Sequence, residues 1–168
     1  LMISDLQEPS AAEILALGGN DGPLIIVGVQ TREGIAGAIT EWFRGVGDLK
    51  KAAVPLKAAI TGKVMRKLCP ECRQAFSPSA EQLKTLGISS GKQVQLFRAS
   101  GRIQVKNKVE ECPVCRGTGF FGTTGVYEVM PIDREARKQL ANGDLRGAYV
   151  HARRSLRMIT MQEAALLK

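Results

Sequence analysis

Aromatic residues and long apolar runs are scarce in this chain, and each scarcity excludes a class of function. Five Phe, two Tyr and one Trp make eight aromatic residues among 168, which is few for a surface that stacks nucleic-acid bases. The longest clear apolar run, Leu24–Val29, contains a glycine and is far shorter than the ~18–20 residues of a membrane-spanning helix. The first ten residues carry no basic head, long apolar stretch or cleavage signal, so we expect a cytoplasmic protein.

Acidic residues are outnumbered by basic ones. The 24 Lys and Arg against 16 Asp and Glu give a net charge of +8, which points to an acidic partner such as nucleic acid, anionic lipid or nucleotide. The cations are spread from Arg32 to Lys168 with no block of five or six. Together with the few aromatic residues, this spread does not favour nucleic acid as the partner.

Cysteine is also rare, but all four cysteines fall in one pattern. They form two C-x2-C pairs, Cys69–Cys72 and Cys112–Cys115, separated by 39 residues. A two-residue gap lets both thiolates of such a knuckle face one metal about 2.3 Å away, and two knuckles complete a tetrahedral zinc site. Four protein ligands leave no open position, so the expected zinc is structural. The only histidine, His151, lies in a helical pattern and is not expected to be a ligand.

Other interpretations of the cysteines stay open. C-P-x-C also occurs in thioredoxin-type redox pairs, although that motif opens a helix and Cys115 is followed by the loop-like Arg116–Gly119. Four inert thiols are a further possibility. Cys112–Gly119 spells one copy of the C-x-x-C-x-G-x-G unit that DnaJ-type chaperones repeat. Gly117–Gly122 spells G-x-G-x-x-G but lacks the flanking strand and helix of a dinucleotide site.

Periodicity in the first third predicts alternating strands and helices. Leu1–Ile3 is expected to end an apolar strand, and Ser10–Leu17 to form a helix. Leu24–Val27 is expected to be a buried, parallel strand, and two helices are expected over Glu33–Trp42 and Lys50–Ile60. This order predicts the end of a parallel α/β sheet.

The rest of the chain predicts a hairpin and then helices. Ser79-x-x-Gln82 is expected to cap a short helix. A hairpin between the knuckles is predicted around Ser100–Gly101, because apolar residues alternate on both sides: Val94, Leu96, Ile103 and Val105. Three further helices are expected to begin at Asp133, Asp144 and Thr160. A chain that opens in a strand and ends in a helix is expected to be a fragment.

Two segments, Lys67–Cys72 and Cys112–Glu128, combine the knuckles with a glycine-rich tail. This combination resembles the tetracysteine region of the type II secretion and type IV pilus assembly ATPases, whose tail reads G-x-x-G-R-x-G-hydrophobic-Tyr/His-Glu. Thr123 stands where that family has arginine, and four residues match the tail: Gly122, Gly125, Tyr127 and Glu128. Residues 142–158 resemble the family's helical end.

The first third resembles the end of the family's P-loop ATPase core, with substitutions at its catalytic positions. Asp5 lies at the position of the family's Walker B glutamate. Gln7 lies at the position of an arginine, and Ser10 lies at the position of a later glutamate. Gln30 replaces the histidine of the family's histidine box, and a glutamine can hydrogen-bond but carries no charge. The phosphate-binding Walker A sequence does not occur in the chain. The chain alone is therefore predicted to be inactive, and the substitutions favour a degenerate, regulatory parent.

The resemblance implies a division into three parts. Residues 1–66 would finish an α/β, RecA-like P-loop core, 67–128 would form the zinc module with its hairpin, and 129–168 would form a helical segment. The full-length parent would be a homo-hexamer, and it alone would bind ATP and Mg²⁺. It would power or regulate pilus or pseudopilus assembly in the cytoplasm, peripheral to the inner membrane, where its zinc module would dock to the platform protein. The alternatives are a free-standing zinc-ribbon adaptor for nucleic acid or protein and a DnaJ-like chaperone piece.

Overall fold

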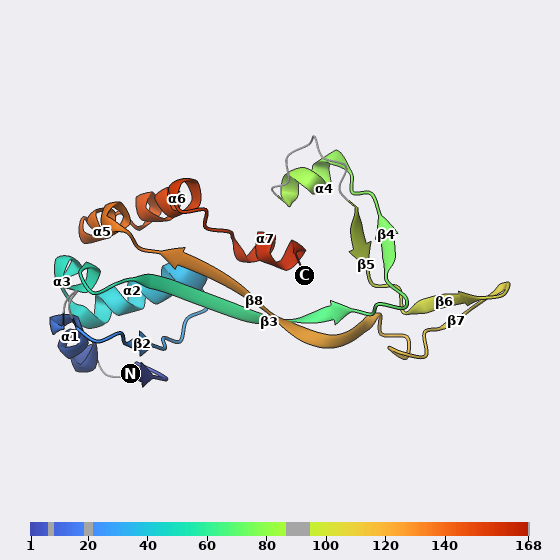
Figure 1. Cartoon of the computed structure of the whole chain (residues 1–168), viewed down its shortest axis with the longest axis horizontal. Coiled ribbons are helices and arrows are strands. Elements are labelled where there is room, and N and C mark those ends of the chain that lie inside the picture. Colours follow the sequence, from blue (N-terminus) through green and yellow to red (C-terminus); the bar gives the residue numbers. More distant parts are fainter. Residues whose placement is uncertain (7–8, 19–21, 87–94, 168) are drawn as a thin grey trace. The chain divides into compact units, whose positions relative to one another are not determined.

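In the computed structural model the chain forms two compact units, each built of helices and strands (Figure 1). The structure describes residues 1–6, 9–18, 22–86 and 95–167. Unit 1 comprises residues 1–62 and 127–160, and unit 2 comprises residues 63–126 and 161–168. Strands β3 (Ala58–Leu68) and β8 (Phe120–Pro131) pair in a two-stranded sheet, and each contributes residues to both units. The predicted mixed α/β class is confirmed.

The N-terminal part of unit 1 contains two short strands and a helix. Strands β1 (Met2–Ile3) and β2 (Ile26–Val27) are parallel, with α1 (Pro9–Leu17) between them in the chain. Among the described residues this is the only parallel pair, so a larger parallel sheet is not seen here. The predicted burial of the second strand is wrong: Leu24 is 72% and Ile26 57% exposed, because neither side chain joins an apolar cluster of the described residues.

Helix α2 (Gly34–Val46) follows the spacing expected of an amphipathic helix. Ile35, Ile39 and Trp42 are buried on one face, and the Trp42 indole Nε1 donates to the Ala52 carbonyl oxygen at 2.9 Å. The second predicted helix is wrong beyond its first turns, because α3 spans only Leu49–Ala53 and the chain enters β3 at Ala58. Pro55 comes two residues after the end of this short helix, beyond its C-cap Val54, and a proline has no backbone N–H to continue the helix.

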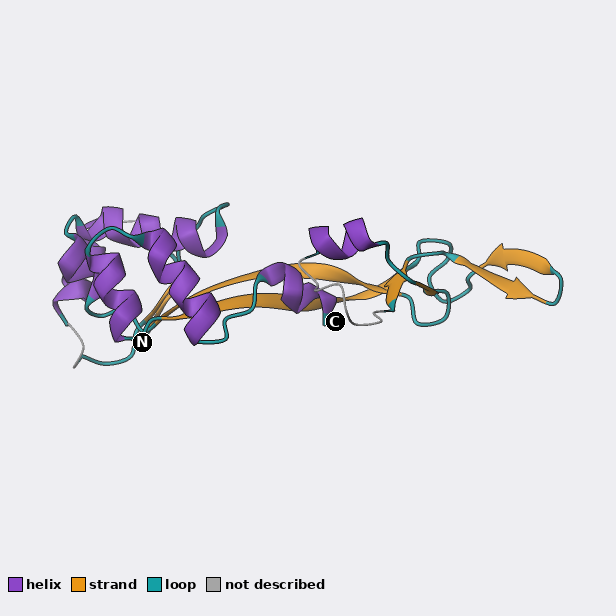
Figure 2. Ribbon diagram, turned by 90° about the horizontal axis from the view of Figure 1, so that it is seen from above, coloured by secondary structure: helices purple, strands orange, loops and turns teal. Residues whose placement is uncertain are grey.

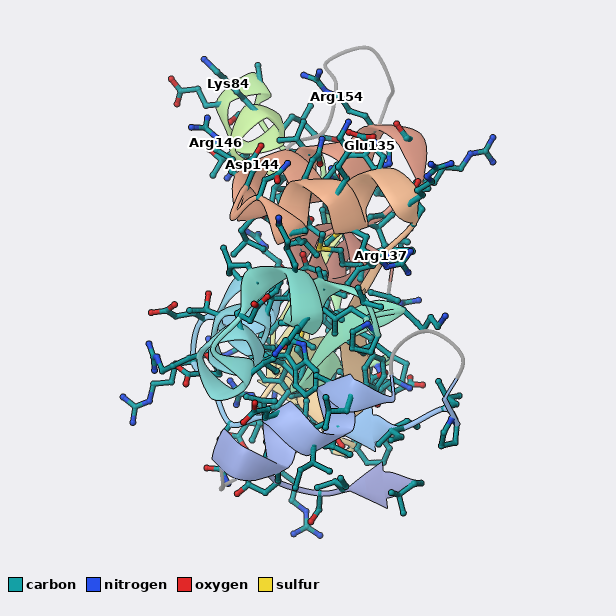
Figure 3. All side chains as sticks on the ribbon, turned by 90° about the vertical axis from the view of Figure 1, so that its left-hand side faces the viewer. Lys84, Glu135, Arg137, Asp144, Arg146 and Arg154 are labelled. Atoms are coloured by element: carbon teal, nitrogen blue, oxygen red, sulfur yellow. The ribbon has the colours of Figure 1, made fainter. Side chains whose placement is uncertain are left out.

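Helices α5 (Arg134–Ala141) and α6 (Leu145–Ser155) begin where the sequence predicts. The Asp133 carboxylate accepts from the Ala136 N–H at 2.9 Å, and the Asp144 carboxylate accepts from the Gly147 N–H at 2.7 Å. The guanidinium of Arg137, on α5 in Figure 3, donates to the Leu56 carbonyl oxygen at 3.0 Å. These helices bury their apolar side chains in one cluster with α2, β3 and β8; its fully buried large members are Met130 and Leu140.

Unit 2 contains two small antiparallel sheets and two short helices (Figure 2). Strand β4 (Gln74–Phe76) pairs with β5 (Leu96–Arg98), and β6 (Arg102–Val105) pairs with β7 (Lys108–Glu111). The helices are α4 (Ala80–Thr85) and α7 (Met161–Leu166). The predicted cap of α4 is confirmed, since Ser79 and Gln82 form a reciprocal capping box.

The predicted hairpin around Ser100–Gly101 is wrong. Strand β5 pairs with β4 instead of β6, and a hairpin forms between β6 and β7, where Val105 pairs with Lys108 around a turn at Lys106. Val94, which the prediction also used, lies outside the described residues. Across the described ranges, no helix combines the length and the apolar composition needed to cross a bilayer.

Candidate functional site

The two cysteine knuckles meet at a buried centre in unit 2. Cys69 comes directly after β3, and Cys112 comes directly after β7. In each knuckle the chain turns back on itself: the Arg73 N–H donates to the Cys69 carbonyl oxygen at 3.0 Å, and the Arg116 N–H donates to the Cys112 carbonyl oxygen at 2.8 Å. All four cysteine side chains are buried, with at most 6% exposed, and Ile103 packs against them.

The four sulfur atoms have the spacing of a tetrahedral metal site. All lie within 4.8 Å of one another. The Sγ atoms of Cys69 and Cys112 are 3.8 Å apart, and those of Cys72 and Cys115 are 3.6 Å apart. Four bonds of about 2.3 Å at tetrahedral angles place sulfur atoms about 3.8 Å apart. A donor set of four soft thiols suits zinc better than a hard cation such as Mg²⁺.

The thiols of the second cysteine in each knuckle have different pKa values. Burial raises the pKa of Cys72 to about 12, and hydrogen bonding to Cys115 adds to the rise. For Cys115 burial also acts to raise the pKa, but the Gly119 N–H and the neighbouring thiols outweigh it and lower the pKa to about 7. The Gly119 nitrogen lies 3.2 Å from the Cys115 Sγ. Of these two thiols, Cys115 therefore becomes a thiolate at the lower pH, and the thiolate is the form that binds metal.

The geometry gives little support to two separate redox pairs. The sulfur contacts of 3.8 and 3.6 Å join one knuckle to the other rather than the two cysteines of one C-x2-C pair. They are also far longer than a disulfide bond of about 2.05 Å, and all four cysteines are free. The residues of both knuckles form turns, whereas a thioredoxin-type cysteine pair opens a helix.

His151 lies on α6 in unit 1 and is not one of the residues that cluster with the cysteines. Its Nε2 is 2.9 Å from the Asp133 Oδ2, so the ring links α6 to the residue that caps α5. The expectation that His151 is no metal ligand stays a prediction, and its contact with Asp133 gives it a structural role in unit 1.

The two residues at the expected catalytic positions lie together in unit 1. Asp5 follows β1 and Gln30 follows β2, and the Gln30 Nε2 donates to the Asp5 Oδ2 at 3.3 Å. Because β1 and β2 are parallel, both residues lie at the carboxyl ends of neighbouring strands, which is where open α/β sheets bind ligands. Gln7 lies outside the described residues, and Ser10 lies in α1.

Gly28 brings these two strand ends close together. Its N–H donates to the Ile3 carbonyl oxygen at 2.8 Å, and its carbonyl oxygen accepts from the Leu6 N–H at 2.9 Å. A Cβ atom at position 28 would lie 2.1 Å from the Ser4 carbonyl oxygen, so a side chain here would separate the strands. A polar cleft of about 490 Å³ opens beside Gln30, and its lining comes from the loop after β2 and from α2: Gln30, Thr31, Arg32, Glu33, Thr40, Glu41 and Arg44.

Gly101 is a residue of the cysteine centre that the sequence pattern places in a hairpin turn instead. Its carbonyl oxygen accepts from the Cys112 N–H at 2.9 Å. The sequence contains one signal for this role. The second knuckle is followed by Gly117 and Gly119, whereas the first is followed by Arg73 and Gln74, so any glycine serving the first knuckle has to come from elsewhere in the chain.

Comparisons with known proteins confirm the family that the sequence resembles. The family model described as "Type II/IV secretion system protein" matches residues 23–167. The chain is 24% identical to the type II secretion system ATPase E of Vibrio cholerae serotype O1, over 86% of this chain and 26% of that protein. It is also 24% identical to the type IV pilus assembly ATPase PilB of Thermus thermophilus, over 100% of this chain and 18% of that protein.

A third relative is the putative type II secretion system protein E of Escherichia coli K12, which is 24% identical over 100% of this chain and 31% of its own length. The chain thus spans between 18% and 31% of the length of these three relatives. Because the family model matches most of the sequence, the chain belongs to the type II/IV secretion system protein family.

Proposed function

We propose that this chain is the C-terminal part of a secretion or type IV pilus assembly ATPase-family protein. Its cysteine knuckles hold one structural zinc ion, and the module around them, residues 67–128, docks to a platform protein of the machine at the inner membrane. The observation that carries the proposal is the convergence of four buried sulfur atoms at tetrahedral spacing in a chain of this family.

The composition of unit 2 supports a folding role for the metal. Apart from the cysteines, its described residues include only two buried apolar side chains, Val126 and Ala164. All four residues of β7 are exposed, so the β6–β7 hairpin has little apolar surface to bury. So small a core supplies too little folding energy by itself, and metal binding at a closed site adds folding free energy directly.

The strand ends of unit 1 support a nucleotide-binding parent. Residues 1–66 finish a RecA-like P-loop core whose catalytic residues lie at the carboxyl ends of β1 and β2. Asp5 and Gln30 occupy these ends and contact each other. The phosphate-binding loop and its lysine would come from another part of the full-length protein, and the assembled hexamer would bind ATP with Mg²⁺ there.

The distribution of charge supports docking through unit 2. Twelve of the 24 Lys and Arg but only five of the 16 Asp and Glu lie in this unit, a net charge of +7, while unit 1 has a net charge of +1. Zinc with four thiolates contributes −2, which leaves the loaded unit strongly basic. We therefore expect an acidic surface on the platform partner.

Metal analysis of the purified chain tests the zinc proposal. We expect one zinc per molecule, and we expect Cys69→Ser or Cys115→Ser to abolish binding and unfold unit 2. Unit 1 contains the only tryptophan, Trp42, so its fluorescence reports unit 1 separately and should not change in either variant. A chain without zinc whose cysteines cycle readily between thiols and disulfides would contradict the proposal and favour the redox interpretation.

The basic surface also favours one competing function, a zinc-ribbon adaptor for nucleic acid. Binding of the chain to duplex DNA should distinguish the two. An adaptor would bind with an affinity that falls steeply with salt, by several released counterions, whereas a docking module should bind DNA only weakly at physiological salt.

A further inference from the structure

Gly119 contacts both knuckles of the cysteine centre. Its N–H donates to the Cys115 Sγ at 3.2 Å, and its carbonyl oxygen accepts from the Cys69 N–H at 2.9 Å. The two peptide groups that flank Gly119 therefore connect the Cys115 sulfur of the second knuckle to the Cys69 backbone of the first.

Gly101 makes the reciprocal pair of contacts. Its carbonyl oxygen accepts from the Cys112 N–H in the second knuckle at 2.9 Å, and its N–H favours the thiolate of Cys72 in the first knuckle, acting to lower the pKa of that thiol. Each glycine thus acts through its N–H on a sulfur of one knuckle and through its carbonyl oxygen on the other knuckle. Gly119 comes only four residues after Cys115, whereas Gly101 comes 29 residues after Cys72.

Both positions require glycine for two reasons. Each has a φ of 76°, in the left-handed region that favours glycine. In addition, a Cβ at Gly101 would lie 2.1 Å from the Gly117 carbonyl oxygen, and a Cβ at Gly119 would lie 2.8 Å from the Ala99 Cβ. The backbone segments around the centre pack too closely for any side chain.

We propose that Gly101 and Gly119 are reciprocal positioning residues of the metal centre. Each gives an N–H donor to one metal-binding thiolate and uses its carbonyl oxygen to hold the opposite knuckle, so the four sulfurs are arranged before the metal binds. The inference rests on the zinc site proposed above. It also explains why Gly101 lies at the centre although it is distant in the chain from Cys72: its N–H is the donor that the first knuckle does not supply from its own residues.

The chain offers a matched control. Gly122 lies in the same unit with a φ of 77°, but a Cβ there would meet nothing within 4 Å. Gly122→Ala therefore imposes a similar backbone strain without touching the centre. We expect Gly101→Ala and Gly119→Ala to weaken zinc binding about 10–100-fold relative to the wild type, which is the usual effect of losing a group that orients a ligand. Gly122→Ala should stay within about twofold of the wild type.

Competition against a chromophoric chelator measures these affinities, and cobalt(II) substitution adds a readout at the sulfur. A thiolate that loses an N–H donor is a better electron donor, so the sulfur-to-cobalt charge-transfer band should move to lower energy in Gly101→Ala and Gly119→Ala but not in Gly122→Ala. If the first two variants do not fold, the unmodified chain loaded with ¹¹³Cd still tests the proposal. The Gly101 and Gly119 amide protons should then show scalar coupling to the metal through the sulfur, and Gly122 should show none.

The possible results can be told apart. If Gly101→Ala and Gly119→Ala have the same zinc affinities and cobalt band positions as Gly122→Ala, the positioning role is overturned and the proposed zinc site is not. The same holds if neither the Gly101 nor the Gly119 amide proton shows scalar coupling to bound ¹¹³Cd. A wild-type chain that binds neither zinc nor cobalt contradicts the proposed metal site itself, and the positioning role fails with it.

Discussion

Asp133 has two structural functions in unit 1, and removing its side chain should reveal both. Its carboxylate caps α5 by accepting from the Ala136 N–H at 2.9 Å. It also lies 2.9 Å from the His151 Nε2 on α6, so it joins the two helices that cover the main apolar cluster. Asp133→Ala should therefore destabilise unit 1 by more than the loss of a cap alone.

The expected size follows from the two contacts. Losing an N-cap costs about 1 kcal/mol, and the half-exposed contact with His151, which is an ion pair only when the ring is protonated, is worth at most about 1 kcal/mol, so Asp133→Ala should cost about 1–2 kcal/mol. In a unit of roughly a hundred residues, each kcal/mol lowers Tm by about 4–8 °C. Asp133→Asn keeps a good cap and loses only the charge, so it should cost less than about 1 kcal/mol. Asp144→Ala removes the cap of α6 without a histidine contact and serves as the matched control.

The pH dependence gives a further check on the carboxylate. The Ala136 N–H, and then His151, hold the pKa of Asp133 below its usual range. Because the pKa is lowered in the folded state, the stabilisation is complete above the ordinary value of about 3.9 and is lost as the pH falls through the native pKa. The stability difference between wild type and Asp133→Asn should therefore narrow as the pH falls below about 4.

Urea unfolding followed by Trp42 fluorescence measures all four proteins, because Trp42 is 7% exposed and lies in a cluster of unit 1. The expected order of stability is wild type, Asp133→Asn, Asp144→Ala and then Asp133→Ala. The reasoning would be refuted if Asp133→Ala cost no more than Asp144→Ala, or if Asp133→Asn cost as much as Asp133→Ala.

Two other substitutions test the core and the strand ends. Met130→Ala or Leu140→Ala removes a fully buried side chain from the main cluster and should cost about 2–5 kcal/mol in the same urea experiment, whereas truncation of the exposed Leu24 should cost little. In the full-length parent, slow ATP hydrolysis is expected, and Asp5→Glu combined with Gln30→His should raise it. Misplacing a catalytic group by about 1 Å can cost ~10²-fold in rate, and Gln30 offers no positive charge to the developing phosphate. Steady-state phosphate release at matched oligomer concentration checks this, and a parent that is already fast and unchanged by the substitutions would contradict it.

The features that the sequence predicts well are those determined by neighbouring residues. A capping side chain acts within three residues, so Ser79, Asp133 and Asp144 mark the starts of α4, α5 and α6 correctly. The geometry of each knuckle is also determined by neighbouring residues, because two residues between the cysteines are enough to turn both sulfur atoms toward one point. That all four sulfurs meet, as they do in the structure, is what the zinc interpretation of this spacing predicts, because two knuckles supply the four ligands of one tetrahedral site.

The failures involve partners that lie far apart in the chain. The residues after α3 form a strand because β8, about sixty residues later, pairs with them. Strand β5 pairs back with β4 across α4 instead of forward with β6, although β6 follows it directly. Alternating apolar residues indicate a strand but not its partner, so the pattern around Ser100–Gly101 predicted strands correctly and paired them wrongly.

Gly101 shows why such an error matters for function. Placed in a turn, this glycine would be a local feature of a hairpin with no connection to the cysteines. In the structure its carbonyl oxygen accepts from the Cys112 N–H, and its N–H acts to lower the pKa of Cys72, so it serves both knuckles, which 39 intervening residues separate. Of the described residues between them, all four of β7 are exposed. In the proposed zinc module, a metal bound by the four cysteines would hold the two ends of this segment together, so that the β6–β7 hairpin, with Lys106 at its turn, needs little apolar core of its own. The residues proposed to hold the metal would therefore also determine how unit 2 presents its charge to the proposed platform partner.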